Sequence, residues 1–248
     1  MSSNIGKEFM RRTRYNEMGD SPQRQGLPQP PLEINYPPDA SLIPLTDPAE
    51  LEFPACNLRE VIERRTSVRN YDQAPLTLDE LSSLLWLTQG VKQVTNRPVT
   101  IRTVPSAGAR HAFETYVLIN RVESLTPGLY RYVALEHSLL PIRLDANIEG
   151  EITEATLKQA QITYSAVTFI WVAVVERMYW RYIERGYRYL HLDAGHVCQN
   201  LYLAAEALNC GVCAMAAFDD EALNAVMGLD GEEQFVIYLA SLGKKVGC

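Results

Sequence analysis

Residues 64–71 gather three arginines, a threonine and a serine, a composition suited to binding a phosphate. The segment reads Arg64-Arg65-Thr66-Ser67-Val68-Arg69-Asn70-Tyr71. Guanidinium groups bind phosphate oxygens in a bidentate manner, and hydroxyls and backbone amides add neutral donors. A phosphate monoester carries about −1.5 to −2 charges at neutral pH, so it needs several cations. A solvated basic patch at a helix end has the same composition, so the segment alone leaves both interpretations open.

A pair of lysines follows the last predicted strand. Gly243, Lys244 and Lys245 come directly after the apolar run 234–242. Their ammonium groups would strengthen a phosphate site if folding carried them to residues 64–69, and otherwise they form a charged terminus. The two basic clusters therefore indicate one anion site only if the fold brings them together.

Two further segments are rich in small residues, which allow a flat ring to approach the backbone. The first is the loop Pro105-Ser106-Ala107-Gly108-Ala109-Arg110-His111, for which an ordinary turn is the alternative. The second is Cys213-Ala214-Met215-Ala216-Ala217-Phe218-Asp219-Asp220, which leads from the end of one predicted helix to the N-terminus of the next. Backbone amides at such a terminus can donate to an anion or to a ring nitrogen.

Other motifs that carry chemistry are absent or incomplete. Cys210 and Cys213 form a CxxC pattern, but no second pair exists for zinc, so small buried thiols are the favoured interpretation. His191 and His196 are five residues apart on a predicted helix and face different directions, so we expect no metal site. The sequence contains no GxGxxG, no P-loop and no GxSxG elbow.

The composition limits the classes of partner and the compartment. The chain has 248 residues and a formal net charge of −7, which disfavours binding to nucleic acid or to an anionic membrane surface. Its longest strongly apolar run, residues 166–175, is too short to span a bilayer and predicts a buried strand. No secretory signal is visible and the five cysteines form no paired framework, so we expect a cytoplasmic protein with reduced thiols.

The order of predicted elements indicates an α+β fold. Capping-box patterns open the first two of the predicted helices, which cover residues 57–65, 77–89, 151–161, 178–208 and 219–228. Strands are predicted over residues 114–120, 128–133, 138–144, 166–175 and 234–242. Helices and strands follow one another without regular alternation, which favours a mixed or antiparallel sheet flanked by helices. The helix of about thirty residues over 178–208 is long for one domain and is typical of a dimer interface.

The first fifty residues differ from the rest of the chain. They hold eight of the fourteen prolines, which exclude a helix or a central strand where they cluster. Apolar residues such as Leu32, Ile34 and Tyr36 are too frequent for a pure linker. We therefore expect residues 1–50 to be an extended arm over the body or over a partner subunit, and residues 51–248 to form one domain. A loose tail is the alternative.

Together these segments resemble the nitroreductase superfamily of FMN enzymes, and most closely its SagB-type dehydrogenases, whose studied members oxidise peptide azolines to azoles. Besides the segments 64–71 and 105–109, the resemblance is carried by Gly128-Leu129-Tyr130-Arg131-Tyr132, by residues 189–200 and by Ala217-Phe218-Asp219-Asp220-Glu221-Ala222-Leu223. It runs from about residue 5 to residue 245 in the family's order. It implies a nitroreductase-like FMN-binding fold and an intertwined homodimer with two FMN sites at the interface, built around a long central helix.

The resemblance also implies roles for individual residues. Those at the FMN phosphate are Arg64, Arg65, Thr66, Ser67, Lys244 and Lys245. Arg69 would stabilise negative charge near N1 and O2 of the reduced ring. Pro105, Ser106, Ala107 and Gly108 would pack on the flavin from the other subunit, and the backbone at Ala216 and Ala217 would face N5, which accepts hydride.

Two departures from the family bear on the reaction. The family loop usually reads Pro-Ile-Gly-Ala-Phe-Asp where this chain has residues 214–219. Azoline-oxidising members carry a Lys-Tyr pair where this chain has Arg181 and Tyr182, and these are its candidate catalytic residues. A tyrosine can act as acid or base, whereas an arginine cannot release a proton at neutral pH, so Tyr182 is alternatively a packing residue.

The expected function is therefore an FMN-dependent oxidoreductase that transfers two electrons as hydride through flavin N5, acting on a small molecule or a peptide azoline-like substrate. A general NAD(P)H-dependent reductase of nitro or quinone compounds is one alternative. A non-catalytic flavin-binding or scaffold protein is the other, motivated by the proline-rich arm and the two departures.

Overall fold

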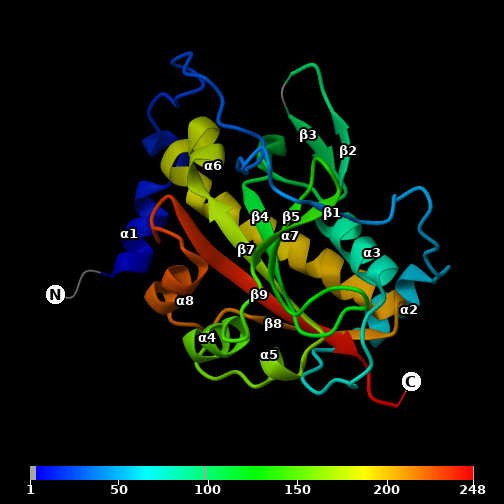
Figure 1. The fold of residues 1–248 in the computed structure, drawn as a ribbon. Coiled ribbons are helices and arrows are strands. Elements are labelled where there is room, and N and C mark those ends of the chain that lie inside the picture. Colours follow the sequence, from blue (N-terminus) through cyan, green and yellow to red (C-terminus); the bar gives the residue numbers. More distant parts are fainter. Residues whose placement is uncertain (1–3, 98, 248) are drawn as a thin grey trace.

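A seven-stranded sheet forms the centre of the computed structural model, which describes residues 4–97 and 99–247 (Figure 1). Its strands lie in the order β1-β6-β5-β4-β7-β9-β8, and every neighbouring pair is antiparallel. They are β1 (Ile43–Pro44), β4 (Phe113–Ile119), β5 (Gly128–Val133), β6 (Ser138–Arg143), β7 (Val167–Val174), β8 (Cys210–Met215) and β9 (Gln234–Lys244). The predicted α+β fold with an antiparallel sheet is confirmed.

Helices cover both faces of this sheet (Figure 1). The α-helices are α1 (Ile5–Arg12), α2 (Leu58–Arg64), α3 (Leu78–Gln89), α4 (Ile148–Ala155), α5 (Gln161–Tyr164), α6 (Val175–Tyr182), α7 (Gly186–Ala207) and α8 (Asp220–Met227). Single turns of 3-10 helix lie at η1 (Tyr15–Glu17), η2 (Ala107–Ala109) and η3 (Ile183–Arg185). A separate hairpin consists of β2 (Val91–Val94) and β3 (Thr100–Arg102). None of the helices within residues 4–97 and 99–247 is long and apolar enough to cross a bilayer.

Alternation along the strands divides the core into two layers. On β7, Phe169 and Trp171 belong to the larger apolar cluster, with α3 and α7, whereas Ile170 and Val172 belong to the smaller one, with α4 and α8. Successive side chains of a strand point to opposite faces, so a strand covered on both sides reads as a continuous apolar run. This explains the unbroken hydrophobic stretch that predicted a buried strand here.

The two predicted capping boxes differ in the structure: the one at α3 is complete, and the one at α2 has only the bonds to the cap side chain. Thr77 accepts a hydrogen bond from the amide of Glu80, and the Glu80 carboxylate accepts one from the amide of Thr77, which is a complete capping box. Asn57 accepts from the amides of Arg59 and Glu60, but the described residues contain no reciprocal bond from the Glu60 side chain.

Two helix predictions are wrong. The continuous helix over 178–208 is interrupted at Ile183, whose φ of 44° and ψ of −138° separate α6 from η3 and α7, so the longest helix has 22 residues. The helix over 151–161 is instead α4, which ends at Ala155, followed by α5. Leu157 and Lys158 adopt φ values of 58° and 60° between them. Neither break has a glycine or proline at the residue that adopts the unusual backbone conformation.

The N-terminal arm packs on the body of its own chain. Residues 5–12 form a helix, and Ile43 and Pro44 extend the central sheet as its edge strand. Between them, Arg177 donates to the carbonyl of Pro31 at 2.9 Å, and the amide of Ile34 donates to Glu114 at 2.9 Å. Arg177 and Glu114 are themselves a buried ion pair with an N–O distance of 2.6 Å. The arm is thus fixed to the sheet by a charge pair that has little contact with solvent.

Candidate functional site

The segment after α2 lies against the edge of the sheet formed by β8 and β9. The amide of Val68 donates to the carbonyl of Val212 at 2.8 Å, and the amide of Asp72 donates to the carbonyl of Lys244 at 2.9 Å. Isolated bridges join Ser67 to Val212 and Tyr71 to Lys245. Residues 64–71 and the lysine pair are far apart in sequence but therefore lie side by side in the fold.

Two glycines allow this close approach. Gly211 and Gly243 are partners in the β8–β9 ladder. A Cβ atom at Gly211 would lie 2.6 Å from Cβ of Val68, and one at Gly243 would lie 2.8 Å from the ring of Tyr71. Any larger residue at either position would push residues 68–71 off the sheet.

The Tyr71 phenol fastens the end of the segment to β9. Its hydroxyl donates to the carbonyl of Val68 at 2.7 Å and lies 2.8 Å from the Ser241 hydroxyl. Burial raises the pKa of the Tyr71 phenol, so the hydroxyl stays protonated and available as a donor.

The cationic side chains of this region surround two carboxylates. Lys245 Nζ lies 2.6 Å from Glu206, Arg64 Nε lies 3.7 Å from the same carboxylate, and Lys244 pairs with Glu80. The adjacent Arg65 makes no ion pair within the described residues, so these four cations have two carboxylate partners, which leaves an excess of two positive charges. In a chain with a net charge of −7, such a surplus favours an anionic ligand of about the same charge.

Tyr202 on α7 connects the arginine-rich segment, residues 64–71, to β8. Its hydroxyl lies 3.0 Å from the Ser67 hydroxyl and accepts a hydrogen bond from the amide of Ala214 at 2.9 Å. The Arg65 guanidinium lies over its ring, 5.4 Å from the centroid. Neither Tyr202 nor Glu206 was predicted from the sequence. Their spacing of four residues beside the apolar stripe of α7 was the only available signal.

Thr66 and Arg69 complete the segment, and both are exposed. The thiol of Cys213 has a raised pKa, chiefly because it is buried, and the positive charge of Arg69 opposes this shift. Arg69 therefore lies near the middle of β8. Cys210 and Cys213 are both buried on this strand, as expected for structural thiols.

The small-residue loop 105–109 is held by α7 at the other end of that helix. The amide of Ala107 donates to both carboxylate oxygens of Asp193 at 3.2 Å, and the amide of His111 donates to the Ser106 hydroxyl at 2.9 Å. Burial raises the pKa of the Asp193 carboxyl. Pro105 and Gly108 are exposed, and Gly108 has a φ of 58°.

Arg181 and Tyr182 lie beside this loop at the end of α6. A Cβ atom at Gly108 would collide with the Tyr182 hydroxyl and would lie 3.0 Å from Cδ of Arg181. The Tyr182 ring stacks edge-on against Tyr189, with 4.8 Å between centroids. The fold therefore brings the candidate catalytic pair to the loop expected to face the flavin, and a side chain at residue 108 would displace the ends of both side chains.

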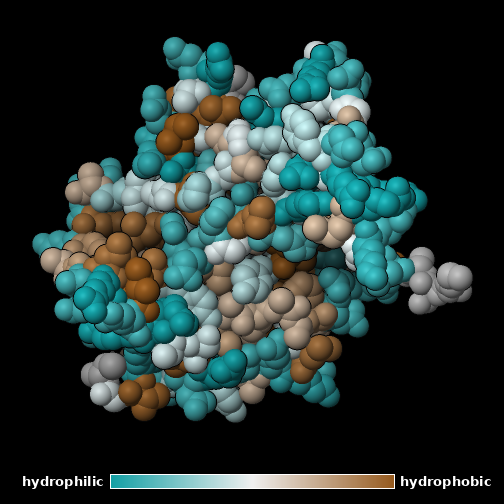
Figure 2. Space-filling view, turned by 180° about the vertical axis from the view of Figure 1, so that it is seen from behind, coloured by the Kyte–Doolittle hydropathy of each residue, from teal (hydrophilic) through white to brown (hydrophobic). Residues whose placement is uncertain are grey.

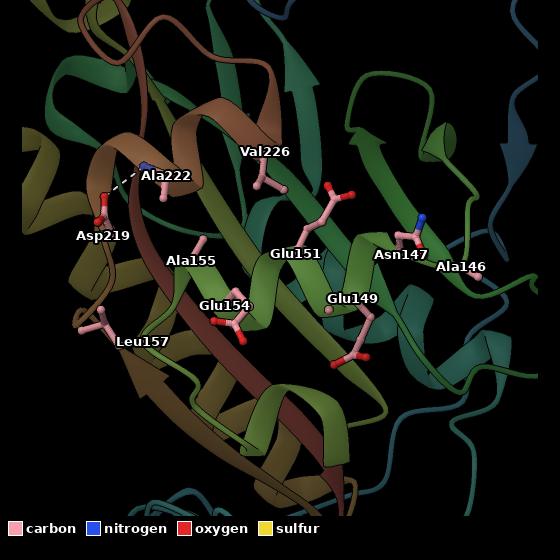
Figure 3. Close-up of a pocket in the computed structure, with 11 residues that line it drawn as sticks. Ala146, Asn147, Glu149, Glu151, Glu154, Ala155, Leu157, Asp219, Ala222 and Val226 are labelled. Carbon is pink, nitrogen blue, oxygen red and sulfur yellow. Dashed lines mark hydrogen bonds between the residues drawn. The ribbon is translucent and has the colours of Figure 1, made fainter.

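Ala216 and Ala217 follow β8 and are exposed. The side-chain amide of Gln159 donates to the carbonyl of Ala217 at 2.7 Å, and Asp219 caps α8 by accepting from the amide of Ala222. Beyond this loop, a groove of about 670 Å³ runs between α4 and α8, with Glu149, Glu151, Glu154 and Asp219 among its lining residues (Figure 3). It contains none of the residues expected to bind the flavin.

The comparison with known families decides the assignment. A model of the nitroreductase family matches residues 62–244. The chain belongs to the nitroreductase family. A protein of Methanocaldococcus jannaschii named as a nitroreductase is 35% identical over 203 residues, which cover 81% of this chain and 98% of that protein. The trifolitoxin-processing protein TfxB of Rhizobium leguminosarum bv. trifolii is 28% identical over 172 residues, 64% of this chain and 46% of its own length.

Solved structures confirm the nitroreductase-like fold. A nitroreductase-type protein of Ralstonia eutropha has a TM-score of 0.69 and 25% identity, covering 90% of this chain and 100% of its own. A chain of the Escherichia coli microcin synthetase complex McbBCD, solved with truncated pro-MccB17 bound, has a TM-score of 0.61 and 17% identity, covering 97% and 91%. A Desulfovibrio desulfuricans member solved in complex with FMN has a TM-score of 0.55 and 16% identity, covering 77% and 88%.

The residues of this nitroreductase-family oxidoreductase fit the phosphate of a flavin mononucleotide. The surplus of positive charge lies where Ser67 and the backbone of the segment add neutral donors, and Arg65 and Lys245 are only half-buried and so accessible to a ligand. Glu206 and Glu80 hold the lysines in place, as carboxylates commonly orient groups that bind a ligand.

Proposed function

We propose that this nitroreductase-family chain is an FMN-dependent oxidoreductase, with the FMN phosphate held between residues 64–69 and the lysine pair. The single observation that carries the proposal is the convergence of these segments, through the bond between Val68 and Val212 and the bridge between Tyr71 and Lys245. Arg64, Arg65, Thr66, Ser67, Lys244 and Lys245 would bind the phosphate.

Bound FMN would supply two-electron hydride chemistry, and the chain's own residues would position it and stabilise its charge. Arg69 would place a cation at the edge of the ring, and the backbone at Ala216 and Ala217 would provide donors to it. Pro105, Ser106, Ala107 and Gly108 would form a flat surface for the ring face.

We further propose that one site is built from two copies of the chain. Glu206, at the phosphate side, and Asp193, which holds the flavin-facing loop, are 13 residues apart on α7, or about 20 Å along its axis. An apolar groove of about 380 Å³, lined partly by Phe53, Leu58 and Leu203, runs beside the same helix. The back face of the molecule carries a cluster of hydrophobic side chains at the left of Figure 2. A homodimer that buries this groove would bring the two halves of each site together.

The substrate class we favour is a peptide azoline or a related dehydrogenation target, as in SagB-type enzymes. The similarity to a trifolitoxin-processing protein and to a chain of a microcin synthetase complex supports this class. Arg181 and Tyr182 would be the catalytic candidates, with Tyr182 moving the proton. Because Arg181 replaces the family's lysine, a general NAD(P)H-dependent reductase of nitro or quinone compounds is the second candidate, favoured by the 35% identity to the Methanocaldococcus jannaschii protein.

The proposal is tested by purifying the chain and measuring flavin released on denaturation, together with its mass in solution. The expected result is a yellow dimer that releases about one FMN per chain. Trials with peptide azolines, NADH and NADPH, nitro compounds and quinones then separate the two candidate reactions. A colourless protein that cannot be reconstituted with FMN would favour a non-catalytic scaffold.

A further inference from the structure

The N-terminal arm and the end of α6 enclose a pocket of about 290 Å³ that the flavin assignment does not use. The arm contributes one wall, through Tyr15, Met18, Gly19, Ser21, Gln23 and Arg24. The body contributes the other, through Arg181, Tyr182, Ile183 and Arg185. The pocket therefore exists only while the arm is folded onto the body.

The lining of this pocket has an unusual charge. Among the ten lining residues three are arginines and none is an aspartate or a glutamate. The chain as a whole has an excess of acidic residues, so a concave surface with three guanidiniums and no lining carboxylate is a departure from its general composition. Guanidiniums in such a surface bind carboxylates and phosphates through paired hydrogen bonds.

The guanidiniums are free to accept a ligand. Arg181 makes no hydrogen bond and no ion pair within residues 4–97 and 99–247, and contacts the Tyr182 ring only as a cation over a face, 5.6 Å from its centroid. Arg185 donates only to uncharged groups, the Tyr189 hydroxyl and the carbonyl of Thr13. Arg24 pairs with Asp20 at 3.8 Å, and both side chains are largely exposed, so that pair is weak.

The wall that the arm provides is well anchored. Arg188 on α7 donates to the Thr13 hydroxyl and to the carbonyl of Met10, both at 2.6 Å. The amide of Gln23 donates to the carbonyl of Trp180 at 2.9 Å, and the Trp180 indole donates to the carbonyl of Leu27 at 3.0 Å. These bonds flank the pocket on both sides, so its shape is set before any ligand enters.

We propose that this pocket binds the anionic group of the oxidoreductase's substrate or electron donor, a carboxylate or a phosphate, and so holds the rest of that molecule at Tyr182 and the Gly108 loop. The pocket shares Arg181 and Tyr182 with the candidate catalytic site, and Tyr182 touches Gly108. The identity of the ligand as substrate or donor rests on the proposed function, whereas the binding of an anion here rests only on the pocket.

The experiment measures binding of matched charged and uncharged probes to the full-length chain as purified. The carboxylate probe is acetyl-trialanine, compared with its C-terminal amide, and the phosphate probe is NADH, compared with reduced nicotinamide riboside. Affinities are measured by calorimetry for the parent, for Arg24→Gln and Arg181→Gln, and for Arg12→Gln. The last is the control, since Arg12 is on the same arm, pairs with Glu8 and does not line the pocket.

The parent is expected to bind at least one charged probe about tenfold or more tightly than its uncharged partner, because a hydrogen bond to a charged group contributes at least that factor. Arg24→Gln and Arg181→Gln should each reduce this preference about tenfold, and Arg12→Gln should leave it unchanged. Preference for the acid over the amide identifies a carboxylate, and preference for NADH over the riboside identifies a phosphate.

The proposal is overturned if neither pair is discriminated, or if the two pocket variants bind the charged probes as the parent does. FMN content is measured in the same samples. A protein without FMN that still prefers the charged probes would contradict the proposed function and leave the anion pocket standing. A flavin-loaded protein without that preference would support the proposed function and overturn the anion pocket.

Discussion

The backbone amide of Val68 donates to the carbonyl of Val212 at 2.8 Å, and this one bond places the arginine-rich segment on the strand that ends in the Ala216–Ala217 loop. Because the bond is between backbone atoms, it fixes where the segment lies without using any side chain that could bind a ligand. The adjacent Ser67 and Arg65 are left exposed or half-buried. Positioning and ligand binding are thus assigned to different groups of the same segment.

Substitution of Gly211 by alanine should disrupt this arrangement. The added Cβ would lie 2.6 Å from Cβ of Val68, so the segment must move, at a cost of about 1–3 kcal/mol in the free energy of unfolding. FMN retention should fall with it. Urea unfolding and released flavin measure both effects. Gly150→Ala is the control, because Gly150 is in α4 with no neighbour within 4 Å, and alanine there should stabilise by up to about 1 kcal/mol. Equal stability and equal FMN retention in the two variants would contradict the role given to Gly211.

Removal of the Tyr202 hydroxyl should loosen both ends of the site. Tyr202→Phe deletes the group that contacts Ser67 and leaves the amide of Ala214 without its acceptor. A loss of about 1–3 kcal/mol in the free energy of unfolding is expected, with weaker FMN binding. Thermal unfolding and flavin titration are the measurements. Tyr164→Phe, at an exposed phenol, should change neither, and an unchanged Tyr202→Phe protein would count against this connection.

The buried pair of Arg177 and Glu114 should hold the arm. Glu114→Gln leaves the Arg177 charge uncompensated at a site where both side chains are 2% exposed, so about 3–5 kcal/mol of stability should be lost. Trypsin should then cleave the arm at Arg24 earlier than in the parent. Glu151→Gln removes a partner of Arg143 in a pair that is about two-fifths exposed on the glutamate side, and should cost under about 1 kcal/mol. If both variants lose the same stability, the arm is not fixed by this pair.

His111 should make stability depend on acidity. Burial, helped by the charges of Arg102 and Arg110, lowers the pKa of His111 to about 3 from its usual 6.5. Between these values the unfolded chain binds a proton that the folded chain does not, so the stability present above pH 6.5 declines as the pH falls. The slope from this residue approaches about 1.4 kcal/mol per pH unit. Urea unfolding from pH 7.5 to 5 should show it, and His111→Asn should reduce it. Parallel curves for parent and variant below pH 6.5 would exclude this role.

The sequence predicted the parts of the fold in which local pattern and tertiary packing agree. The Thr77 and Glu80 pair and the apolar run of β7 correspond to a capping box and a doubly covered strand, and both are present. The break at Ile183 could not be read, because a β-branched residue with positive φ is held there by its surroundings and not by its own preference. Strand β8 was missed because its glycine, cysteines and alanine have weak strand propensity, and β9 is the only strand that pairs with it among the described residues.

The residues that would bind the ligand could be predicted from the sequence, but the residues that hold them in position could not. Arginines, lysines and small-residue loops are visible in the sequence, because their chemistry is in the side chain. Tyr202, Glu206 and Asp193 lie in a helix whose apolar pattern does not show what their side chains contact. Their roles arise only from contacts across about a hundred residues of chain, such as those of Tyr202 with Ser67 and of Asp193 with Ala107.

The most direct test of the phosphate site compares FMN with riboflavin, which lacks the phosphate. Flavin-free samples of the parent, of Lys245→Gln and of the control Lys158→Gln are titrated with each flavin. Lys158 is largely exposed, pairs with Glu154 and belongs to neither basic cluster. The account predicts that the parent and the control bind FMN at least about a hundredfold more tightly than riboflavin, and that Lys245→Gln reduces this ratio about tenfold or more. Equal affinities of the parent for FMN and riboflavin would contradict it.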